Sequence, residues 1–148
     1  MVKNEKGFSL AELVVVVATI ALLTWVVLPR DYVADASLGA AAYKIQSDIR
    51  YAQELAMTKG TRHQIRFFSS TNRYEVVTAS GQPVVNPLTG DGSYVVDFNS
   101  GVYPGVQLSS TVTIEFDSLG RPNAGQTVSL NSGAKVVTVT AETGLVSL

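Results

Sequence analysis

Lys6-Gly7-Phe8-Ser9-Leu10-Ala11-Glu12 opens an apolar run that continues without another charge to Leu28. As a helix, residues 8–28 would measure roughly 31 Å at about 1.5 Å per residue, which matches the hydrocarbon core of a bilayer. A carboxylate in such a segment costs about 2.5 to 3.5 kcal/mol at the helix centre on insertion scales, so Glu12 needs a partner. The stretch therefore predicts a membrane-spanning helix with one functional carboxylate.

Charges on either side of this run predict its orientation. Lys3 and Lys6 precede it, which favours a cytoplasmic N-terminus and an exported C-terminal part, while Arg30 beyond the run is balanced by Asp31. Pro29 lacks an amide hydrogen and is expected to kink the helix where the membrane ends. A plain helix terminator at a membrane boundary explains the same proline equally well.

A second helix is predicted after the proline, because apolar residues recur there at alternating spacings of four and three. These positions are Leu38, Ala42, Ile45, Ile49, Ala52 and Ala56, with Leu55 beside them. Polar residues, Asp48 among them, fall mostly elsewhere, and Gly60 supplies an end after Lys59. The stripe is short for a coiled coil and favours packing on a sheet.

The chain after the second helix is expected to form short strands and turns. The predicted strands cover residues 63–68, 73–78, 93–98, 111–116, 127–130, 135–140 and 145–148. Residues 80–92, with two prolines and several glycines, are expected to form a loop. The predicted fold class is α+β. Its long N-terminal helix spans the membrane, is kinked near Pro29, and packs by its C-terminal half on an antiparallel β-sheet domain.

Length and composition limit the organisation of the chain. Its 148 residues hold one membrane segment and one modest domain, and 11 basic against 12 acidic residues show no electrostatic footprint for nucleic acid. The absence of cysteine excludes disulfides and thiolate metal sites. We expect a leader (1–7), a transmembrane and assembly helix (8–28), a kink with an amphipathic helix (29–60) and a β-rich domain (61–148). Residues 35–148 are expected to form the soluble globular unit.

The side chains offer little for catalysis or metal binding. His63 is the single histidine, so a metal site with two imidazoles is excluded within one chain, and a surface position in a strand is expected for it. Gly90-Asp91-Gly92 lacks the regular oxygen ligands of a calcium loop and is expected to be a turn. We predict no catalytic residue, no metal site, no cofactor and no enzymatic activity.

Three arginines are the best candidates for contact with nucleic acid. Arg62, Arg66 and Arg73 are interleaved with Phe68 and Tyr74, so cations and stacking surfaces would lie on adjacent strands. Their alternate spacing equally suits the solvated face of a sheet. Both interpretations stay open on the sequence alone.

The short basic leader, Gly7, Phe8, Glu12 and the apolar run occur in one register. Together they resemble the class III signal of type IV pilin-like proteins. The resemblance implies that a prepilin peptidase cuts between Gly7 and Phe8 and methylates the new amino terminus on Phe8. It also implies that Glu12 acts in assembly, where it pairs with the Phe8 ammonium of a neighbouring subunit. A carboxylate that simply snorkels to the headgroups is the alternative.

Two later stretches are similar to signatures of the GspH/FimT group of minor pseudopilins. The phenylalanine-x-x-x-glycine signature of the group is matched by Ile114-Glu115-Phe116-Asp117-Ser118-Leu119-Gly120-Arg121-Pro122. Its terminal threonine-glycine signature is matched by Val137-Thr138-Val139-Thr140-Ala141-Glu142-Thr143-Gly144. Residues 48–56 also look like the second helix of that group. The resemblance implies a minor pilin or pseudopilin of a type II secretion system or type IV pilus.

The same resemblance implies a location and partners. The protein would be a single-pass component of the bacterial inner membrane with a periplasmic C-terminal domain, incorporated into a pilus or pseudopilus. Its partners would be other pilin subunits, the prepilin peptidase and the inner-membrane assembly platform. A DNA-binding minor pilin for uptake and a major structural pilin are the alternatives. Leu145 stands where the group often has a basic residue, which argues against nucleic acid as a partner.

Overall fold

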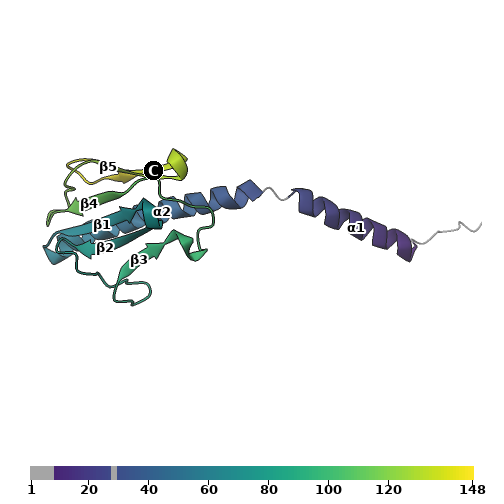
Figure 1. Cartoon of the computed structure of the whole chain (residues 1–148), viewed down its shortest axis with the longest axis horizontal. Helices are drawn as coiled ribbons and strands as arrows, with labels where there is room; N and C mark the ends of the chain where they lie inside the picture. Colours follow the sequence, from purple (N-terminus) through teal and green to yellow (C-terminus); the bar gives the residue numbers. More distant parts are fainter. Residues whose placement is uncertain (1–8, 28–29) are drawn as a thin grey trace, which may run out of the picture. The chain divides into compact units, whose positions relative to one another are not determined.

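The computed structural model describes residues 9–27 and 30–148 (Figure 1). The chain divides into two compact units, Met1–Tyr32 and Val33–Leu148. The predicted leader, the cut site between Gly7 and Phe8, and the kink at Pro29 lie outside the described residues.

Helix α1 (Leu10–Val27) begins after Ser9. The Ser9 carbonyl accepts from the Leu13 amide at 3.1 Å and its Oγ from the Ala11 amide at 3.3 Å, which satisfies donors at the open end of the helix. Glu12 lies in the first turn, where the helix dipole favours a negative charge. Within the described residues, no helix combines the length and hydropathy that a membrane crossing requires.

Helix α2 (Arg30–Lys59) carries the predicted apolar stripe on its buried side. All six predicted stripe positions are buried, and Leu55 packs beside them. The helix ends as expected before Gly60, whose φ of +63° is left-handed. The Thr61 amide reaches the Ala56 carbonyl at 3.2 Å and the Gly60 amide reaches Met57 at 3.4 Å, the two hydrogen bonds of a Schellman motif.

Two antiparallel sheets follow α2, where a single sheet was expected. The strands are β1 (His63–Phe68), β2 (Arg73–Thr78), β3 (Tyr94–Asp97), β4 (Val112–Phe116), β5 (Gln126–Leu130), β6 (Lys135–Val139) and β7 (Val146–Ser147). The first sheet has the order β3-β2-β1-β4 and the second the order β5-β6-β7. The predicted strands are therefore confirmed with shifts of one residue at some ends, but the division into two sheets was not expected.

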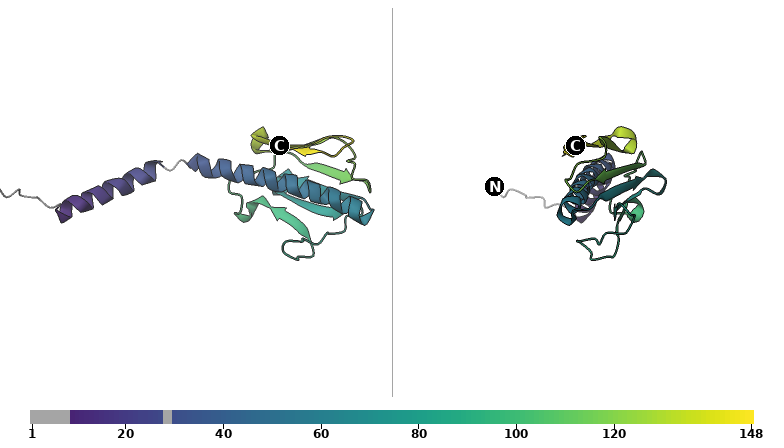
Figure 2. Two further views of the ribbon diagram at one scale, coloured as in Figure 1. Left: turned by 180° about the vertical axis from the view of Figure 1, so that it is seen from behind. Right: turned by 90° about the vertical axis from the view of Figure 1, so that its left-hand side faces the viewer.

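Both sheets share one core with α2. The helix lies along one face of the four-stranded sheet, with the shorter sheet alongside (Figures 1 and 2). The register pairs Ile65 with Ile114 and Phe67 with Tyr74, which brings large buried side chains under the helix. The second sheet adds Val128, Leu130, Val137, Val139 and Val146 to the same cluster. The α+β class and the packing of α2 on antiparallel strands are confirmed.

Two polar residues are buried against expectation. His63 is 4% exposed rather than a surface residue, and its Nδ1 lies 3.0 Å from the Thr61 carbonyl oxygen. It points inward because it shares the inward-facing period of β1 with Ile65 and Phe67. Asp48, which sequence analysis placed among the polar residues outside the stripe, is 2% exposed. Its position next to Ile49 puts it at the border of the stripe, within reach of the strands.

Candidate functional site

Helix α1 displays apolar side chains on every side. The exposed ones are Leu10, Leu13, Val14, Val15, Val16, Val17, Ile20, Leu22 and Leu23. Successive residues of a helix turn by about 100°, so this run leaves no polar face. The hydroxyl of Thr19 lies 2.9 Å from the carbonyls of both Val15 and Val16, and its polar group is thereby satisfied inside the helix. A helix of this kind requires an apolar environment from outside its own unit.

Glu12 is the single charged residue in the sequence of α1, and it is exposed. No donor among the described residues forms a hydrogen bond or ion pair with its carboxylate. The structure thus places the predicted assembly carboxylate on the surface of an apolar helix, available to a partner from another chain.

A buried cluster joins α2 to β2 and β3 around the second carboxylate of interest. Asp48 accepts hydrogen bonds from Tyr74 Oη at 2.6 Å, Tyr94 Oη at 2.9 Å, and Lys44 Nζ at 2.6 and 2.7 Å. Burial, reinforced by the neighbouring Asp48 charge, raises the pKa of Tyr74 and of Tyr94 well above the usual value of a phenol. Both tyrosines therefore remain protonated and donate to Asp48. We call this cluster the clamp, because it holds α2 to β2 and β3, and each oxygen of the Asp48 carboxylate accepts two hydrogen bonds.

The three arginines proposed for nucleic acid do not form one basic surface. Arg62 lies 3.5 Å from Glu115, and Arg66 lies 3.8 Å from Glu75 while also donating to Gln64. Arg73 stacks over the Phe68 ring at 5.9 Å.

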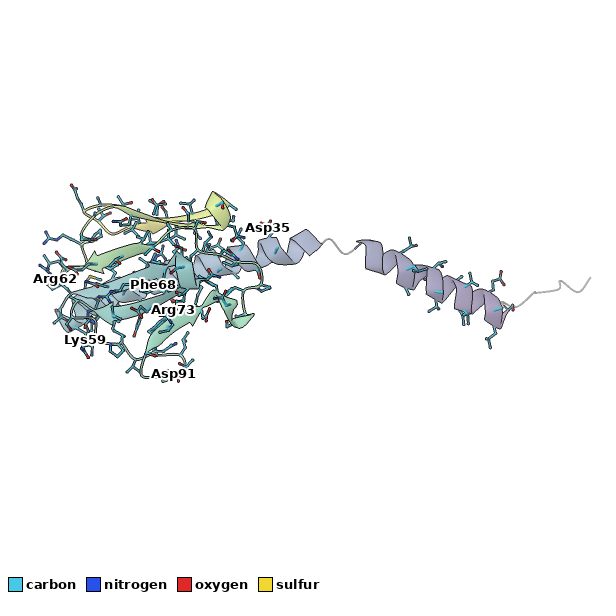
Figure 3. All side chains as sticks on the ribbon, in the orientation of Figure 1. Asp35, Lys59, Arg62, Phe68, Arg73 and Asp91 are labelled. Carbon is cyan, nitrogen blue, oxygen red and sulfur yellow. The ribbon has the colours of Figure 1, made fainter. Side chains whose placement is uncertain are left out.

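These arginines are also spread along the sheet. Arg62 lies near Lys59, and Arg73 lies beside Phe68 (Figure 3). At about 3.3 Å per strand residue, Arg62 and Arg73 are roughly 20 Å apart. Acidic side chains lie among the three arginines, since Asp97 is the cross-strand neighbour of Arg73. The arrangement corresponds to the solvated sheet face that the sequence left open, with alternating signs of charge.

The two glycine signatures meet at one point on α2, which sequence analysis did not foresee. Gln53 Nε2 donates to the Gly120 carbonyl at 2.7 Å and approaches the Thr143 carbonyl at 3.5 Å. Gly120 and Gly144 are both buried, with φ of +77° and +66°. A Cβ on Gly120 would lie 2.7 Å from Met57 Sδ, and one on Gly144 would collide with the Gln53 amide. Glycine is favoured at both positions, because φ is left-handed and because an added Cβ would displace the Met57 or Gln53 side chain.

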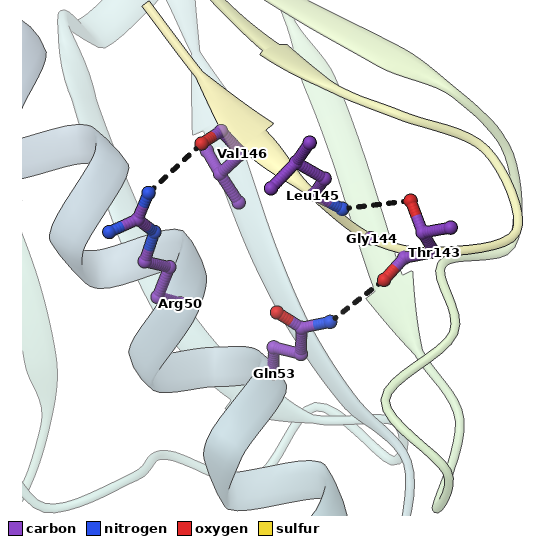
Figure 4. A pocket seen from close by; sticks show the side chains of 6 residues that line it. All are labelled: Arg50, Gln53, Thr143, Gly144, Leu145 and Val146. Atoms are coloured by element: carbon purple, nitrogen blue, oxygen red, sulfur yellow. Dashed lines mark hydrogen bonds between the residues drawn. The ribbon is translucent and has the colours of Figure 1, made fainter.

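Beside this junction lies an open hollow of about 560 Å³ between α2 and the C-terminal turn (Figure 4). It is lined by Arg50, Gln53, Thr143, Gly144, Leu145 and Val146. The Arg50 guanidinium donates from Nη2 to the Val146 carbonyl at 3.1 Å, and Gln46 donates to the same carbonyl at 3.1 Å. These two side chains cover the free edge of β7. The signal in the sequence was the pair of glycine motifs, but their meeting point on α2 required the fold.

Known proteins share this fold. Structures similar to this chain include the type IV minor pilin FimU of Pseudomonas aeruginosa, at 16% identity and a TM-score of 0.54, covering 79% of this chain and 91% of that one. The minor pseudopilin EpsH from the Type 2 Secretion System of Vibrio cholerae is similar at 15% identity and a TM-score of 0.51, covering 76% of this chain and 95% of that one. At these identities the likeness shows the fold alone. No curated protein sequence matches the chain.

The family assignment comes from the sequence of the second unit. The family model described as type II transport protein GspH matches residues 41–144, which include most of α2 and the strands as far as Gly144. The match covers both glycine signatures and agrees with the predicted resemblance to the GspH/FimT group. It also agrees with the prediction that the protein is not an enzyme. The chain belongs to the GspH family, a family of pilin-like proteins of type II secretion and type IV pilus systems.

Proposed function

We propose that this protein is a minor subunit of a type II secretion pseudopilus or type IV pilus, drawn into the filament through residues 8–28. One observation carries the proposal: α1 is apolar on every side and has one exposed carboxylate, Glu12. A surface of that kind is stable only when lipid or other apolar helices cover it. The inner membrane before assembly and the filament core after it supply these two environments.

Assembly requires a free amino terminus close to Glu12. A prepilin peptidase that cuts between Gly7 and Phe8 and methylates Phe8 would produce it. In the filament, the Phe8 ammonium of a neighbouring subunit neutralises Glu12 in apolar surroundings, where an unpaired carboxylate is penalised. This pair selects the register between subunits.

The remaining parts of the proposal concern topology. Residues 1–7 are the cytoplasmic leader, Pro29 marks a bend between the assembly segment and the domain, and residues 35–148 form the globular part in the periplasm. The inner-membrane assembly platform and other pilin subunits are the partners. The arginines of the sheet do not favour DNA uptake as a second function, because carboxylates lie beside Arg62 and Arg66.

The test combines processing with assembly. Intact mass of protein from membranes that contain the peptidase should show loss of residues 1–7 and one added methyl group. Glu12→Ala should still be inserted and cut but should be strongly depleted from sheared filaments, and Glu12→Asp should be intermediate. A mature protein that still begins at Met1, or parental filament levels of Glu12→Ala, would contradict the proposal.

A further inference from the structure

The hollow beside Gly144 is held in shape by bonds that join three parts of the chain. Gln53 ties α2 to the Gly120 turn, while Gln46 and Arg50 tie it to β7. The turn that presents Gly120 is itself fixed, because Asp117 Oδ1 accepts from the Leu119 and Arg121 amides, both at 2.9 Å. Its lining side chains are therefore positioned before any partner arrives, which lowers the entropic cost of binding.

Arg50, like Arg73, is exposed and forms no ion pair among the described residues, which sets it apart from three other arginines. Arg62, Arg66 and Arg121 each lie within 4 Å of a carboxylate. Arg50 has no ion pair with any carboxylate of the described residues, and its one protein acceptor is a neutral carbonyl. A guanidinium carries five N–H donors in a planar fork, so donors remain for an oxygen ligand in the hollow.

The rim of the hollow adds an apolar contact. Leu145 is 62% exposed and is one of the residues that line the hollow. Thr143 Oγ1 accepts from the Leu145 amide at 3.3 Å, and its own hydroxyl hydrogen is left to donate. The hollow thus presents a charged donor, a hydroxyl donor and an exposed aliphatic side chain, a set that fits a carboxylate flanked by apolar atoms.

We propose that this hollow docks an acidic side chain of a neighbouring pilin-like subunit, with Arg50 as the residue that recognises its carboxylate. The inference rests on the proposed function and names the contact that the globular part makes in the filament. Charge complementarity selects the occupant, because Arg50 is the single charged residue among the six that line the hollow. A bidentate pair between guanidinium and carboxylate adds orientation as well as energy.

A polyanion such as nucleic acid fits the same place less well. Glu54 lies one helical turn from Arg50 on α2, and Glu142 precedes Thr143. These two negative charges repel a run of phosphates more strongly than they repel a single carboxylate. The favoured ligand is therefore a single acidic side chain of a protein.

Photocrosslinking of the full chain in cells that assemble the filament tests the proposal. The photoreactive amino acid benzoylphenylalanine replaces Leu145 in one variant and Val17 of α1 in a second, and crosslinked peptides are identified by mass spectrometry. We expect the Leu145 probe to join a pilin-like subunit at a peptide that contains Asp or Glu. The Val17 probe reports incorporation through α1 and is independent of the hollow.

Variants of Arg50 separate recognition from a structural role. Arg50→Lys keeps the charge, whereas Arg50→Gln removes it but retains a donor for the Val146 carbonyl. Relative to the Val17 crosslink of the same variant, the Leu145 crosslink should fall at least about tenfold in Arg50→Gln and about twofold in Arg50→Lys. In a charge swap, Arg50→Glu combined with Lys at the identified acidic residue should restore the crosslink, which a merely destabilised fold would not allow.

Each remaining outcome decides the matter. A Leu145 crosslink that is equal in Arg50→Gln and Arg50→Lys, or that joins nucleic acid or a protein that is not pilin-like, overturns the docking proposal. A Val17 crosslink to a pilin-like subunit without any Leu145 crosslink overturns it while the proposed function stands. Absence of the Val17 crosslink as well overturns the proposed function, and the docking proposal falls with it.

Discussion

Helices α1 and α2 follow one another in the chain but meet opposite requirements. α1 is apolar in every direction and exposes its apolar side chains. α2 confines its buried residues to one stripe and leaves residues such as Tyr43 and Arg50 exposed. The stripe is covered by strands of the same chain, whereas the apolar side chains of α1 stay exposed. The difference separates a helix that packs into the core of its own unit from the helix that we propose to act in assembly.

The two helices also treat a carboxylate differently. Asp48 is buried and accepts bonds from two tyrosines and a lysine of its own unit. Glu12 is exposed in an apolar helix, with no donor among the described residues. A buried charge such as Asp48 is tolerated because its hydrogen-bond partners belong to the same fold. In the proposed assembly, Glu12 acquires its partner only when a neighbouring subunit arrives.

The largest effect is expected from Asp48→Ala. The substitution leaves the Lys44 ammonium and two buried hydroxyls without their acceptor, so the free energy of unfolding should fall by about 3 kcal/mol or more. Denaturant unfolding of the full chain in detergent, followed by circular dichroism, measures it. Glu54→Ala on the exposed side of α2 is the control and should change stability by less than about 0.5 kcal/mol. A loss below about 1 kcal/mol for Asp48→Ala would mean that the clamp is not a stabilising element.

Gly144→Ala should have the next largest effect. Alanine at a φ of +66° is strained, and its Cβ would also meet Gln53 and lie 3.0 Å from the Gly120 carbonyl oxygen. Strain and crowding together should cost about 2 to 4 kcal/mol. Gly60→Ala is the matched control, because Gly60 has a φ of +63° but no atom within 4 Å of an added Cβ. Gly60→Ala should lower the free energy of unfolding only by the backbone strain, about 1 to 2 kcal/mol. Equal losses in both variants would show that the close contacts of Gly144 do not contribute to stability.

Alkaline pH should loosen the clamp by a smaller amount. The pKa values of Tyr74 and Tyr94 are raised in the folded protein, chiefly by burial and then by Asp48. Their contribution is therefore fully present below a pH of about 10, the pKa of an exposed tyrosine, and is lost as pH rises above it. At pH 11 the loss should be on the order of 1 kcal/mol per tyrosine. Tyr94→Phe should reduce the fall in stability between pH 9 and 11 by about half, and an unchanged slope would remove Tyr94 from the explanation.

The smallest effect on stability is expected from Glu12→Ala. Since no described residue donates a hydrogen bond or forms an ion pair with the Glu12 side chain, the free energy of unfolding of the globular unit should change by less than about 0.5 kcal/mol. Its effect should instead appear in filament content, as described above. A large loss of folding stability would indicate that Glu12 has a partner within its own chain and would remove the contrast with Asp48.

Much of the fold could be predicted because its signals are local. The α2 stripe and the end of the helix before Gly60 follow from residue spacing along a few turns. The strands 63–68 and 73–78 follow from short apolar runs between turn residues. The division into two sheets could not be predicted, because it depends on the pairing of β1 with β4, whose partner residues lie 45 to 53 positions apart. His63 was predicted wrongly although a local signal was present, since it alternates with Ile65 and Phe67 on the apolar face of β1.

The candidate site divides in the same way. The sequence by itself determined the apolar run with its one carboxylate, the GspH-type signatures and the α+β class, because each is a property of residues close together in the chain. The assembly role of Glu12 stays a prediction. Only the tertiary structure decided that Gly120 and Gly144 meet on Gln53 and that Arg50 lines the hollow beside them. These contacts join residues that are far apart in the chain. Local sequence patterns do not specify contacts between residues so far apart in the chain. The packing of α2 against both sheets brings these residues together.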